Sequence, residues 1–379
     1  MNASRDEQFM CRALRLAALG RHASPNPMVG CVLAAPDGRV VGEGYHPQAG
    51  MPHAEVYALR QAGARARGAT AYVSLEPCAH HGRTPPCADA LWQAGVARVV
   101  AALTDPDPRV AGRGLERLRA GGVDVTVGVG ETAARALNAA FLKHRTSGLP
   151  WVVLKTAMTL DGKVAAVTGD SRWITSPLSR KAVHRQLRDR CDALLTGVGT
   201  VLADDPALTT RLGHRAGRDP LRVIVDSRCR TPLDSQVVRR AAEDGKTLIA
   251  TTAHADTERR EALAAHGCRV LVCESDLPGS DDIGGGGRVD LADLMRRLGT
   301  QDDIIGVLVE SGGGLAAGLL ATGLVDRWLA FVAPKIVCGR DAPGPVGGVG
   351  FARMADALPV REWRTRRCGP DLVIDARFG

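Results

Sequence analysis

Three residues able to bind a metal lie within a stretch of 35 residues near the start of the chain, with a carboxylate beside them. They are His53, Cys78 and Cys87, and Glu55 follows His53 by two positions. One imidazole and two thiolates are the protein ligands of a hydrolytic zinc site, in which the fourth position is left for water. Because these ligands come from separate segments, a metal here requires the segments to fold onto one another.

The ligands are expected at the starts of helices and after the end of a strand. Residues 53–63 are predicted to be a helix that starts at His53. Its expected apolar stripe and C-terminal stop are Val56, Leu59, Ala62 and Gly63. Residues 86–95 are predicted to be a second helix, which opens at Cys87. Two helix N-termini facing a metal would favour a thiolate and a hydroxide electrostatically.

The carboxylate of Glu55 suits a proton shuttle. Zinc lowers the pKa of a bound water from 15.7 to about 7, and the hydroxide can attack the amidine-like carbon of an aminopyrimidine. A carboxylate beside the metal can take the water proton and deliver it to the departing amino group. The alternative is a structural zinc site, which needs a fourth protein ligand that His80 or His81 could supply. The polar, Gly/Pro-rich loop around these histidines favours a pocket role for them.

The spacing matches half of a known signature. Zinc nucleobase deaminases carry His-x-Glu followed by Pro-Cys-x-x-Cys, with the Glu as proton shuttle. The first part matches at His53, but eight residues separate Cys78 from Cys87 instead of two.

Composition limits the classes of partner. A length of 379 residues predicts two or more domains. The polar N-terminus and the lack of a run of about 20 apolar residues indicate neither a signal peptide nor a membrane span. Ten cysteines without a short-range framework suggest the cytoplasm. Those expected to fill the core are Cys31, Cys268, Cys273 and Cys338. A net charge of +8 with only 3% aromatic residues favours a small phosphorylated substrate over a nucleic acid.

The first 145 residues alternate helical and extended patterns, which predicts an α/β sandwich with a mostly parallel sheet. Residues 28–34 and 39–46 are expected to form a hairpin, and residues 131–144 a closing helix. A Gly/Pro linker at 146–150 places the domain boundary between 147 and 148.

The second domain, 148–379, also alternates strands and helices. Residues 327–337 and 371–378 are expected to be a final strand pair, and the Gly/Asp-rich segment 279–288 a loop. The run Gly312-Gly313-Gly314 follows a predicted strand and leads into a helix, where backbone N–H groups can bind phosphate. A plain tight turn is the alternative. The run is not the dinucleotide fingerprint, so a classical Rossmann domain is not supported.

Longer stretches carry a family resemblance. Residues 25–63 and 72–91 resemble the deaminase half of the bifunctional riboflavin-biosynthesis deaminase/reductases. The second half resembles their reductase through LKTAMTLDGKVA, GDSRWITSP, TGVGTVLADDPALTTR, VIVDSR and VESGGGLAAGLL. The long interval between the two cysteines is normal for this family.

The resemblance implies a cytidine-deaminase-like three-layer sandwich followed by a dihydrofolate-reductase-like α/β domain. It implies that 2,5-diamino-6-(5-phosphoribosylamino)pyrimidin-4(3H)-one is deaminated with one zinc ion per chain. NADPH then reduces the ribosyl side chain of the product to ribityl. A cytoplasmic homo-oligomer, dimer or tetramer, is expected.

The resemblance also implies residue roles. His53, Cys78 and Cys87 hold zinc, with Glu55 and Lys155 as catalytic groups. The implied substrate-binding residues are Asn26, His46, His80, Arg83, Ser171, Arg188, Leu208, Arg211 and Glu310. The implied cofactor-binding residues are Ala157, Trp173, Thr200, Asp204, Ser227, Arg228, Gly312, Gly313, Gly314, Leu315, Ala316, Ala317 and Gly318. Arg188 aligns with its motif only after a shift of one residue. Arg83 is a candidate for the substrate phosphate, and Arg228 for the 2′-phosphate of NADPH.

Each role has a simpler alternative. Trp173 could be ordinary packing, and Arg188 and Arg211 surface cations. Asp161 and Asp205 are expected in turns or caps, and His184, His214 and His254 on the surface. Rival functions are a zinc deaminase acting on free nucleosides, tRNA or DNA, and a regulatory or structural zinc protein with an inactive reductase-like half.

Overall fold

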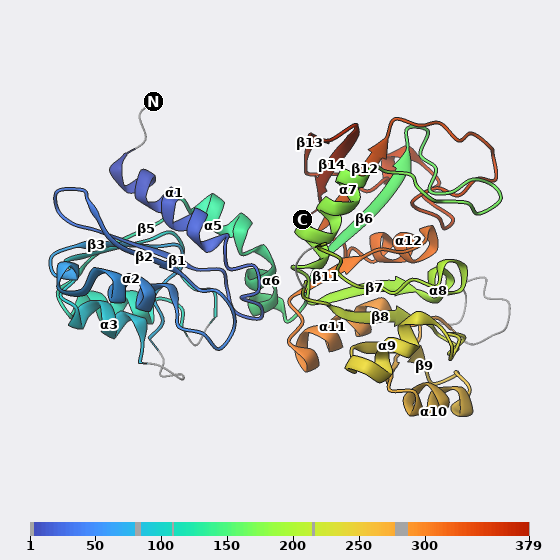
Figure 1. Cartoon of the computed structure of the whole chain (residues 1–379), viewed down its shortest axis with the longest axis horizontal. Coiled ribbons are helices and arrows are strands. Elements are labelled where there is room, and N and C mark those ends of the chain that lie inside the picture. Colours follow the sequence, from blue (N-terminus) through green and yellow to red (C-terminus); the bar gives the residue numbers. More distant parts are fainter. Residues whose placement is uncertain (1–3, 80–84, 108–109, 214–216, 277–286, 379) are drawn as a thin grey trace. The chain divides into compact units, whose positions relative to one another are not determined.

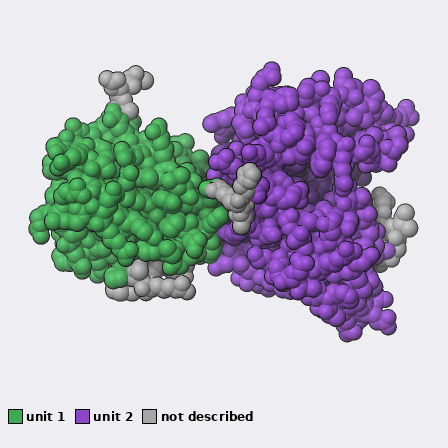
Figure 2. Space-filling view, in the orientation of Figure 1, with its two compact units in different colours: residues 1–148 green, residues 149–379 purple. Residues whose placement is uncertain are grey.

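A computed structural model of the chain describes residues 4–79, 85–107, 110–213, 217–276 and 287–378. The chain divides into two compact units, Met1–Gly148 and Leu149–Gly379 (Figure 2). No helix in the described part is both long enough and apolar enough to cross a membrane.

The first unit is built on a five-stranded sheet of order β2-β1-β3-β4-β5. The strands are β1 Gly30–Ala34, β2 Val40–Tyr45, β3 Thr70–Val73, β4 Arg98–Ala101 and β5 Asp124–Val127. β1 and β2 form the predicted antiparallel hairpin, and β1 is also antiparallel to β3. Only β3, β4 and β5 run parallel. The expectation of a mostly parallel sheet was therefore wrong for this unit, because the hairpin supplies half of the described pairings.

Helices cover both faces of this sheet, which confirms the three-layer α/β sandwich (Figure 1). They are α1 Arg5–Ala17, α2 Ala54–Ala62, α3 Cys87–Gln93, α4 Arg113–Ala120, α5 Glu131–Leu137 and α6 Ala139–Ser147, with a 3₁₀ turn at Gly63–Ala66. α1 and α5 lie on one face, and α2 and α3 on the other. The single closing helix predicted for 131–144 is divided at Asn138. The Asn138 side chain is buried and hydrogen-bonds to the backbone N–H and C=O of Met28. It therefore links the junction of α5 and α6 to the segment just before β1.

α2 packs unusually close to the sheet. A Cβ atom at Gly42 would lie 2.1 Å from the Ala58 carbonyl oxygen, and one at Gly44 2.7 Å from that of Ala54. The face of α2 toward the sheet consists of small residues, Ala54, Ala58 and Ala62, and it also carries buried Glu55. The apolar stripe predicted for this helix was therefore wrong at Val56 and Leu59, whose side chains are only partly buried. Close packing has no room for large side chains.

The second unit contains a nine-stranded sheet of order β10-β9-β8-β7-β11-β6-β12-β14-β13. The strands are β6 Trp151–Thr159, β7 Ala193–Gly197, β8 Leu221–Val225, β9 Thr247–Thr252, β10 Arg269–Cys273, β11 Gly306–Val309, β12 Arg327–Ala333, β13 Glu362–Cys368 and β14 Asp371–Arg377. Strands from β10 to β12 are parallel to their neighbours, and β14 and β13 add antiparallel pairings. The predicted pair β12 and β14 is confirmed. The sequence did not predict β13, because this exposed edge strand is charged and has no apolar alternation.

The helices of this unit are α7 Pro177–Val183, α8 Val198–Asp204, α9 Gln236–Asp244, α10 Thr257–Ala265, α11 Leu291–Asp302 and α12 Gly313–Ala321. A π-helical turn, His184–Arg188, follows α7, and a 3₁₀ turn spans Met354–Asp356. The predicted helix after the glycine run is confirmed as α12. Apolar clusters cover both faces of the sheet, one around Leu195 and Leu248, the other around Leu194 and Ile224.

The cysteines follow the expected pattern with one exception. Cys31, Cys268 and Cys273 are buried, as predicted, whereas Cys338 is exposed. Cys338 lies beyond the end of β12, so the apolar run before it does not extend the core. All ten cysteines are free thiols. Most of the predicted loop 279–288 lies outside the described residues.

Candidate active sites

The three expected metal ligands converge in the first unit. Nδ1 of His53 lies 3.4 Å from Sγ of Cys87 and 3.7 Å from Sγ of Cys78. A tetrahedral zinc ion bonded at about 2.0 Å to nitrogen and 2.3 Å to sulfur separates such atoms by about 3.6 Å. Among the described residues, this is the group that could hold a metal ion. The residues present therefore fit zinc, with Nδ1 as the imidazole ligand.

Local structure aims the ligands at one point. His53 is the N-cap of α2 and makes no capping hydrogen bond with its side chain, so the ring is left to face the sulfur atoms. Cys87 is the first residue of α3, as expected, and its backbone N–H donates to Sγ of Cys78 at 3.3 Å. Hydrogen bonds from the Cys87 thiol and from His53 lower the pKa of Cys78 below its usual range. A thiolate at neutral pH is the form that binds zinc.

Glu55 lies beside these ligands and is 3% exposed. Its Oε2 atom is buried and has no hydrogen-bond partner among the residues that the structure describes. Burial raises the pKa of this carboxyl group. A buried acceptor without a partner is costly, so it indicates a missing ligand or water. The position suits a carboxylate that bonds to water held next to the metal.

A cavity of about 180 Å³ adjoins the metal ligands. Asn26 and His46 line it, with Nδ2 of Asn26 3.1 Å from Nε2 of His46. Nδ1 of His46 lies 3.0 Å from the Pro52 carbonyl oxygen, so Nδ1 carries the proton and Nε2 accepts. Burial lowers the pKa of His46, in agreement with a neutral ring. His80, His81 and Arg83, the other residues considered for this site, lie outside the described residues.

The sequence missed four residues that line this cavity: Asp105, Asp107, Phe141 and Arg145. The aspartates follow β4, at the same sheet edge as the segment after β3 that carries Cys78. Buried Glu76 holds this loop, since its carboxylate accepts the backbone N–H groups of Asp105, Gly112 and Gly114. The Asp-Pro-Asp-Pro segment at 105–108 after a strand was the available signal. Phe141 and Arg145 had none, because α6 reaches the cavity only through the tertiary fold.

A larger cavity of about 860 Å³ lies in the second unit. It occupies the C-terminal ends of the parallel strands, where α/β proteins bind ligands. The expected cofactor residues that line it are Ser227, Arg228, Gly314, Leu315 and Gly318. The others do not line it: Ala157, Trp173, Thr200, Asp204, Gly312, Gly313, Ala316 and Ala317. Ala316 faces the opposite way, into the core.

Two residues of the glycine run, Gly313 and Gly314, are glycines for different structural reasons. A Cβ atom at Gly313 would lie 2.9 Å from the backbone nitrogen of Gly347, which donates to the Gly313 carbonyl. A Cβ atom at Gly312 or Gly314 meets nothing within 4 Å. Gly313 therefore closely approaches another loop of this unit, which is a reason for a glycine there that is independent of the proposed cofactor contact. Gly314 is the glycine at the cavity.

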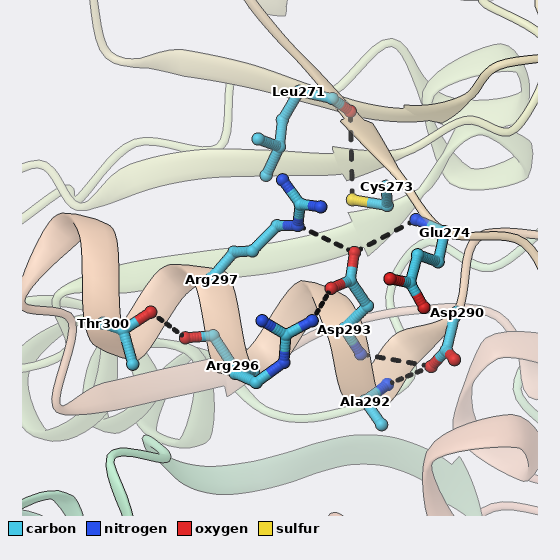
Figure 3. A network of polar contacts seen from close by, with 9 residues as sticks. All are labelled: Leu271, Cys273, Glu274, Asp290, Ala292, Asp293, Arg296, Arg297 and Thr300. Carbon is cyan, nitrogen blue, oxygen red and sulfur yellow. Dashed lines mark hydrogen bonds and ion pairs between the residues drawn. The ribbon is translucent and has the colours of Figure 1, made fainter.

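The N-terminus of α11 forms the opposite wall of this cavity and is held by a polar network (Figure 3). Asp290 caps the helix, accepting the N–H groups of Ala292 and Asp293. The buried Asp293 carboxylate accepts from Nε of Arg297 at 2.8 Å and from the backbone N–H of Glu274 at 3.0 Å, and it also bonds to Arg296. The network therefore ties α11 to the end of β10.

A charged cluster lies at the same edge of the sheet. Nζ of Lys155, on β6, lies 3.9 Å from Oε2 of Glu310, which directly follows β11. Arg188 binds the Glu310 carboxylate with two hydrogen bonds of 3.0 and 2.9 Å. Burial alone would raise the pKa of Glu310, but Arg188 and Lys155 outweigh it and hold the pKa at about 2. Glu310 is therefore ionised at neutral pH.

Arg188 reaches Glu310 because of the π-helical turn. A π-helix carries an extra residue in its turn, so the following side chains are rotated relative to an α-helix. That extra residue is a physical reason for the one-residue shift seen in the alignment of this segment. The surface alternative for Arg188 is excluded, since its side chain is 12% exposed.

His184 was expected on the surface, and this was wrong. Its ring is partly buried, and Nδ1 accepts the backbone N–H of Arg211 at 3.1 Å. Burial and then the nearby Arg188 and Arg211 lower its pKa to about 4. No motif could have revealed it, because its partner is 27 residues away. His254 is exposed as expected, and His214 lies outside the described residues.

The remaining expected residues lie elsewhere in this unit. Ser171 and Trp173 line a third cavity of about 190 Å³. Trp173 is 60% exposed, with the Arg180 guanidinium 4.3 Å from its ring, so it is not core packing. Leu208 is buried at a φ of +47°. The expected turn roles are confirmed, because Asp161 accepts the N–H groups of Val337 and Cys338, and Asp205 accepts that of Gln236 at the start of α9.

Comparison with known proteins assigns both halves. Residues 3–103 match the cytidine and deoxycytidylate deaminase zinc-binding region, and residues 150–374 match the RibD C-terminal domain. The riboflavin biosynthesis protein RibD of Escherichia coli K12 is 45% identical, with 97% of this chain and 98% of that protein covered. The chain belongs to the RibD family. The RibD protein of a Synechocystis species is 44% identical, covering 97% of this chain and 95% of its own.

Solved RibD structures agree. Acinetobacter baumannii RibD superposes with a TM-score of 0.86 at 38% identity, covering 98% of both chains. A Thermotoga maritima diaminohydroxyphosphoribosylaminopyrimidine deaminase/5-amino-6-(5-phosphoribosylamino)uracil reductase gives 0.82 at 34% identity, covering 99% of both chains. As a RibD protein, this chain is a bifunctional deaminase and reductase of riboflavin biosynthesis, with a zinc-binding deaminase half and an NADPH-dependent reductase half.

Proposed function

We propose that the first unit deaminates the phosphoribosylated diaminopyrimidine through His53, Cys78, Cys87 and Glu55. The observation that carries this proposal is the unpartnered, buried Glu55 oxygen beside three converging ligand atoms. Zinc held by these residues would supply a water whose pKa is lowered to about 7 as the nucleophile. Glu55 takes the proton of that water and passes it to the departing amino group, which leaves as ammonia. Asn26 and His46 hold the pyrimidine, and we assign Arg83 to its phosphate.

The second unit reduces the deaminated product. NADPH, when bound, would supply the hydride that reduces C1′ of the opened imine, and the nitrogen would gain a proton. Lys155 lies in a cluster with the Glu310 carboxylate and two further cations, Arg188 and Arg211, and Asp219 also interacts electrostatically with both arginines. This excess of positive charge suits an anionic substrate. We assign Lys155 to stabilising charge or relaying a proton at the imine, and Ser171, Leu208 and Glu310 to substrate binding.

The large cavity is the proposed dinucleotide site. Ser227 and Arg228 follow β8 at its rim, and no described residue pairs with the Arg228 side chain. A guanidinium there suits the 2′-phosphate that distinguishes NADPH from NADH. The expected cofactor residues outside this cavity, such as Trp173 in the third cavity, are proposed to contact other parts of NADPH.

We further propose that the two domains fold independently, with the boundary in the sequence between residues 147 and 148. We also propose that the protein is a homo-oligomer and that it is cytoplasmic, which suits its ten free thiols. The central test is a two-stage assay on the purified full chain, with and without zinc and NADPH. Ammonia release that needs zinc, followed by oxidation of NADPH only after deamination, is expected. Deamination of free nucleosides instead, or no turnover by zinc-loaded protein, would contradict the proposal.

A further inference from the structure

The π-helical turn His184–Arg188 and the loop 208–211 are tied together at two points. Nη1 of Arg188 donates to the carbonyl oxygen of Thr209 at 2.9 Å. The backbone N–H of Arg211 donates to Nδ1 of His184 at 3.1 Å. The turn therefore holds the loop at positions 209 and 211, from side chains four residues apart in the turn.

His184 can hold Arg211 only as a neutral ring. Because Nδ1 accepts an N–H group, the ring proton belongs on Nε2. Burial and the neighbouring cations keep the ring neutral at pH 7. The hydrogen bond is therefore intact under ordinary conditions.

The guanidinium of Arg211 has no partner among the described residues, although its backbone is anchored. It lies near enough to Arg188 and Glu310 to interact with both electrostatically. Both oxygens of Glu310 are already bonded to Arg188. A free cation beside a satisfied ion pair is positioned for an anion from outside the protein.

We propose that His184 is a positioning residue of the reductase, which holds the backbone of Arg211 so that its guanidinium meets the anionic substrate. The inference rests on the proposed role of Arg211 in substrate binding. His184 acts through Arg211 and does not itself enter the reaction.

The test is a double-mutant cycle in the full chain, loaded with zinc and NADPH, with 5-amino-6-(5-phosphoribosylamino)uracil as substrate. The variants are His184→Ala, Arg211→Ala, the double variant and His184→Asn. Asn places Oδ1 close to the position of Nδ1 and can accept the same N–H group. Substrate KM, NADPH KM and kcat are measured for each.

His184→Ala is expected to raise the substrate KM about three- to tenfold, the range of one net hydrogen bond. The KM for NADPH and kcat should change less than about twofold, and His184→Asn should restore the substrate KM to within about twofold of wild type. In the Arg211→Ala background, His184→Ala should add nothing, because the two residues act as one unit.

The inference would be overturned if the rise in substrate KM in the double variant equalled the product of the two single-variant effects. It would also be overturned if His184→Asn failed to restore the substrate KM. A His184→Ala variant that raises both KM values equally has a general structural role, which also overturns it. If the substrate KM is unchanged in Arg211→Ala, Arg211 does not bind substrate and the inference fails. The reductase assignment still stands in that case, provided that the wild-type protein reduces the substrate. A wild-type protein that reduces nothing contradicts the proposed function instead.

Discussion

Lys155 and Glu310 meet across two neighbouring parallel strands, with Nζ of Lys155 3.9 Å from Oε2 of Glu310. The register of β11 on β6 pairs Val309 with Leu154, so the two charged residues are the next positions along each strand. Residues 155 positions apart in the sequence are thus neighbours by sheet register. The Lys155 ammonium group is thus placed beside a carboxylate that Arg188 also binds.

Replacing Lys155 tests this arrangement. Lys155→Met should lower kcat for reduction roughly 10²-fold, the typical effect of removing one group that stabilises charge in a transition state. Deamination should be unchanged, because its proposed groups belong to the other unit. Both rates are measured on the same preparation. A kcat for reduction within a few-fold of wild type would exclude Lys155 from the chemistry.

Glu55→Gln should keep zinc and lose deamination. A positioned general acid–base group contributes about 10²–10⁴-fold to a rate. The variant keeps the shape of the buried side chain, so the metal content should stay stoichiometric and reduction of pre-deaminated substrate should be untouched. Metal analysis and ammonia release give the answer, and loss of zinc would identify Glu55 as a ligand.

Cysteine substitutions test the metal site. Cys78→Ser and Cys87→Ser should each lose zinc and deamination, because each removes one of three protein ligands. Cys31→Ser is the matched control, since Cys31 is buried in β1, as Cys87 is in α3, but is not part of the ligand cluster. Equal zinc content in all three variants would disprove the site.

Arg228→Ala should reduce the preference for NADPH over NADH, since a bidentate contact to the 2′-phosphate is lost. Arg239→Ala, at an exposed position of α9, is the control and should leave the preference unchanged. Gly314→Val should raise both cofactor KM values together, because its side chain would enter the cavity. Equal losses with both cofactors in Arg228→Ala would make Arg228 an ordinary surface cation.

The charged cluster predicts loss of stability in acid. His184 has a pKa of about 4 in the folded chain, below its ordinary 6.5, so the unfolded chain binds a proton first as pH falls through that window. Glu310, at about 2 instead of 4.5, adds a loss at lower pH. The groups facing them are Lys155, Arg188 and Arg211. Denaturant unfolding from pH 7 to 4 should show a steeper decline for wild type than for His184→Asn, and parallel curves would contradict this.

The motifs predicted the position of site residues that lie at the start of a helix or just after a strand. His53 and Cys87 start helices, and Cys78 follows a strand, as their spacing indicated. The order of ligands therefore predicted a site whose geometry the structure supplies. The apolar stripe of α2 was misplaced because glycines on the preceding strand, β2, admit only small residues at that face of the helix.

Residues without a local signal were missed for a common reason. Arg145 reaches the deaminase cavity from α6, and His184 reaches Arg211 from a π-helical turn. The Arg145 guanidinium lies over the Phe141 ring one turn earlier in α6, but the other residues of the cavity that both line come from distant segments, so no periodicity marks them. The close approach of the Gly347 backbone to Gly313 likewise had no local signal, because that loop lies more than 30 residues downstream.

The linear order of residues is enough to identify the family, the zinc ligands and the two-domain organisation, since these depend on residue type and local spacing. The tertiary structure alone decides which glycine faces the cavity, which histidine is buried and which carboxylate meets Lys155. Those outcomes depend on strand register and helix packing, where a shift of one residue moves a side chain to the opposite face. Such long-range contacts are set by the packing of the whole core rather than by any one segment.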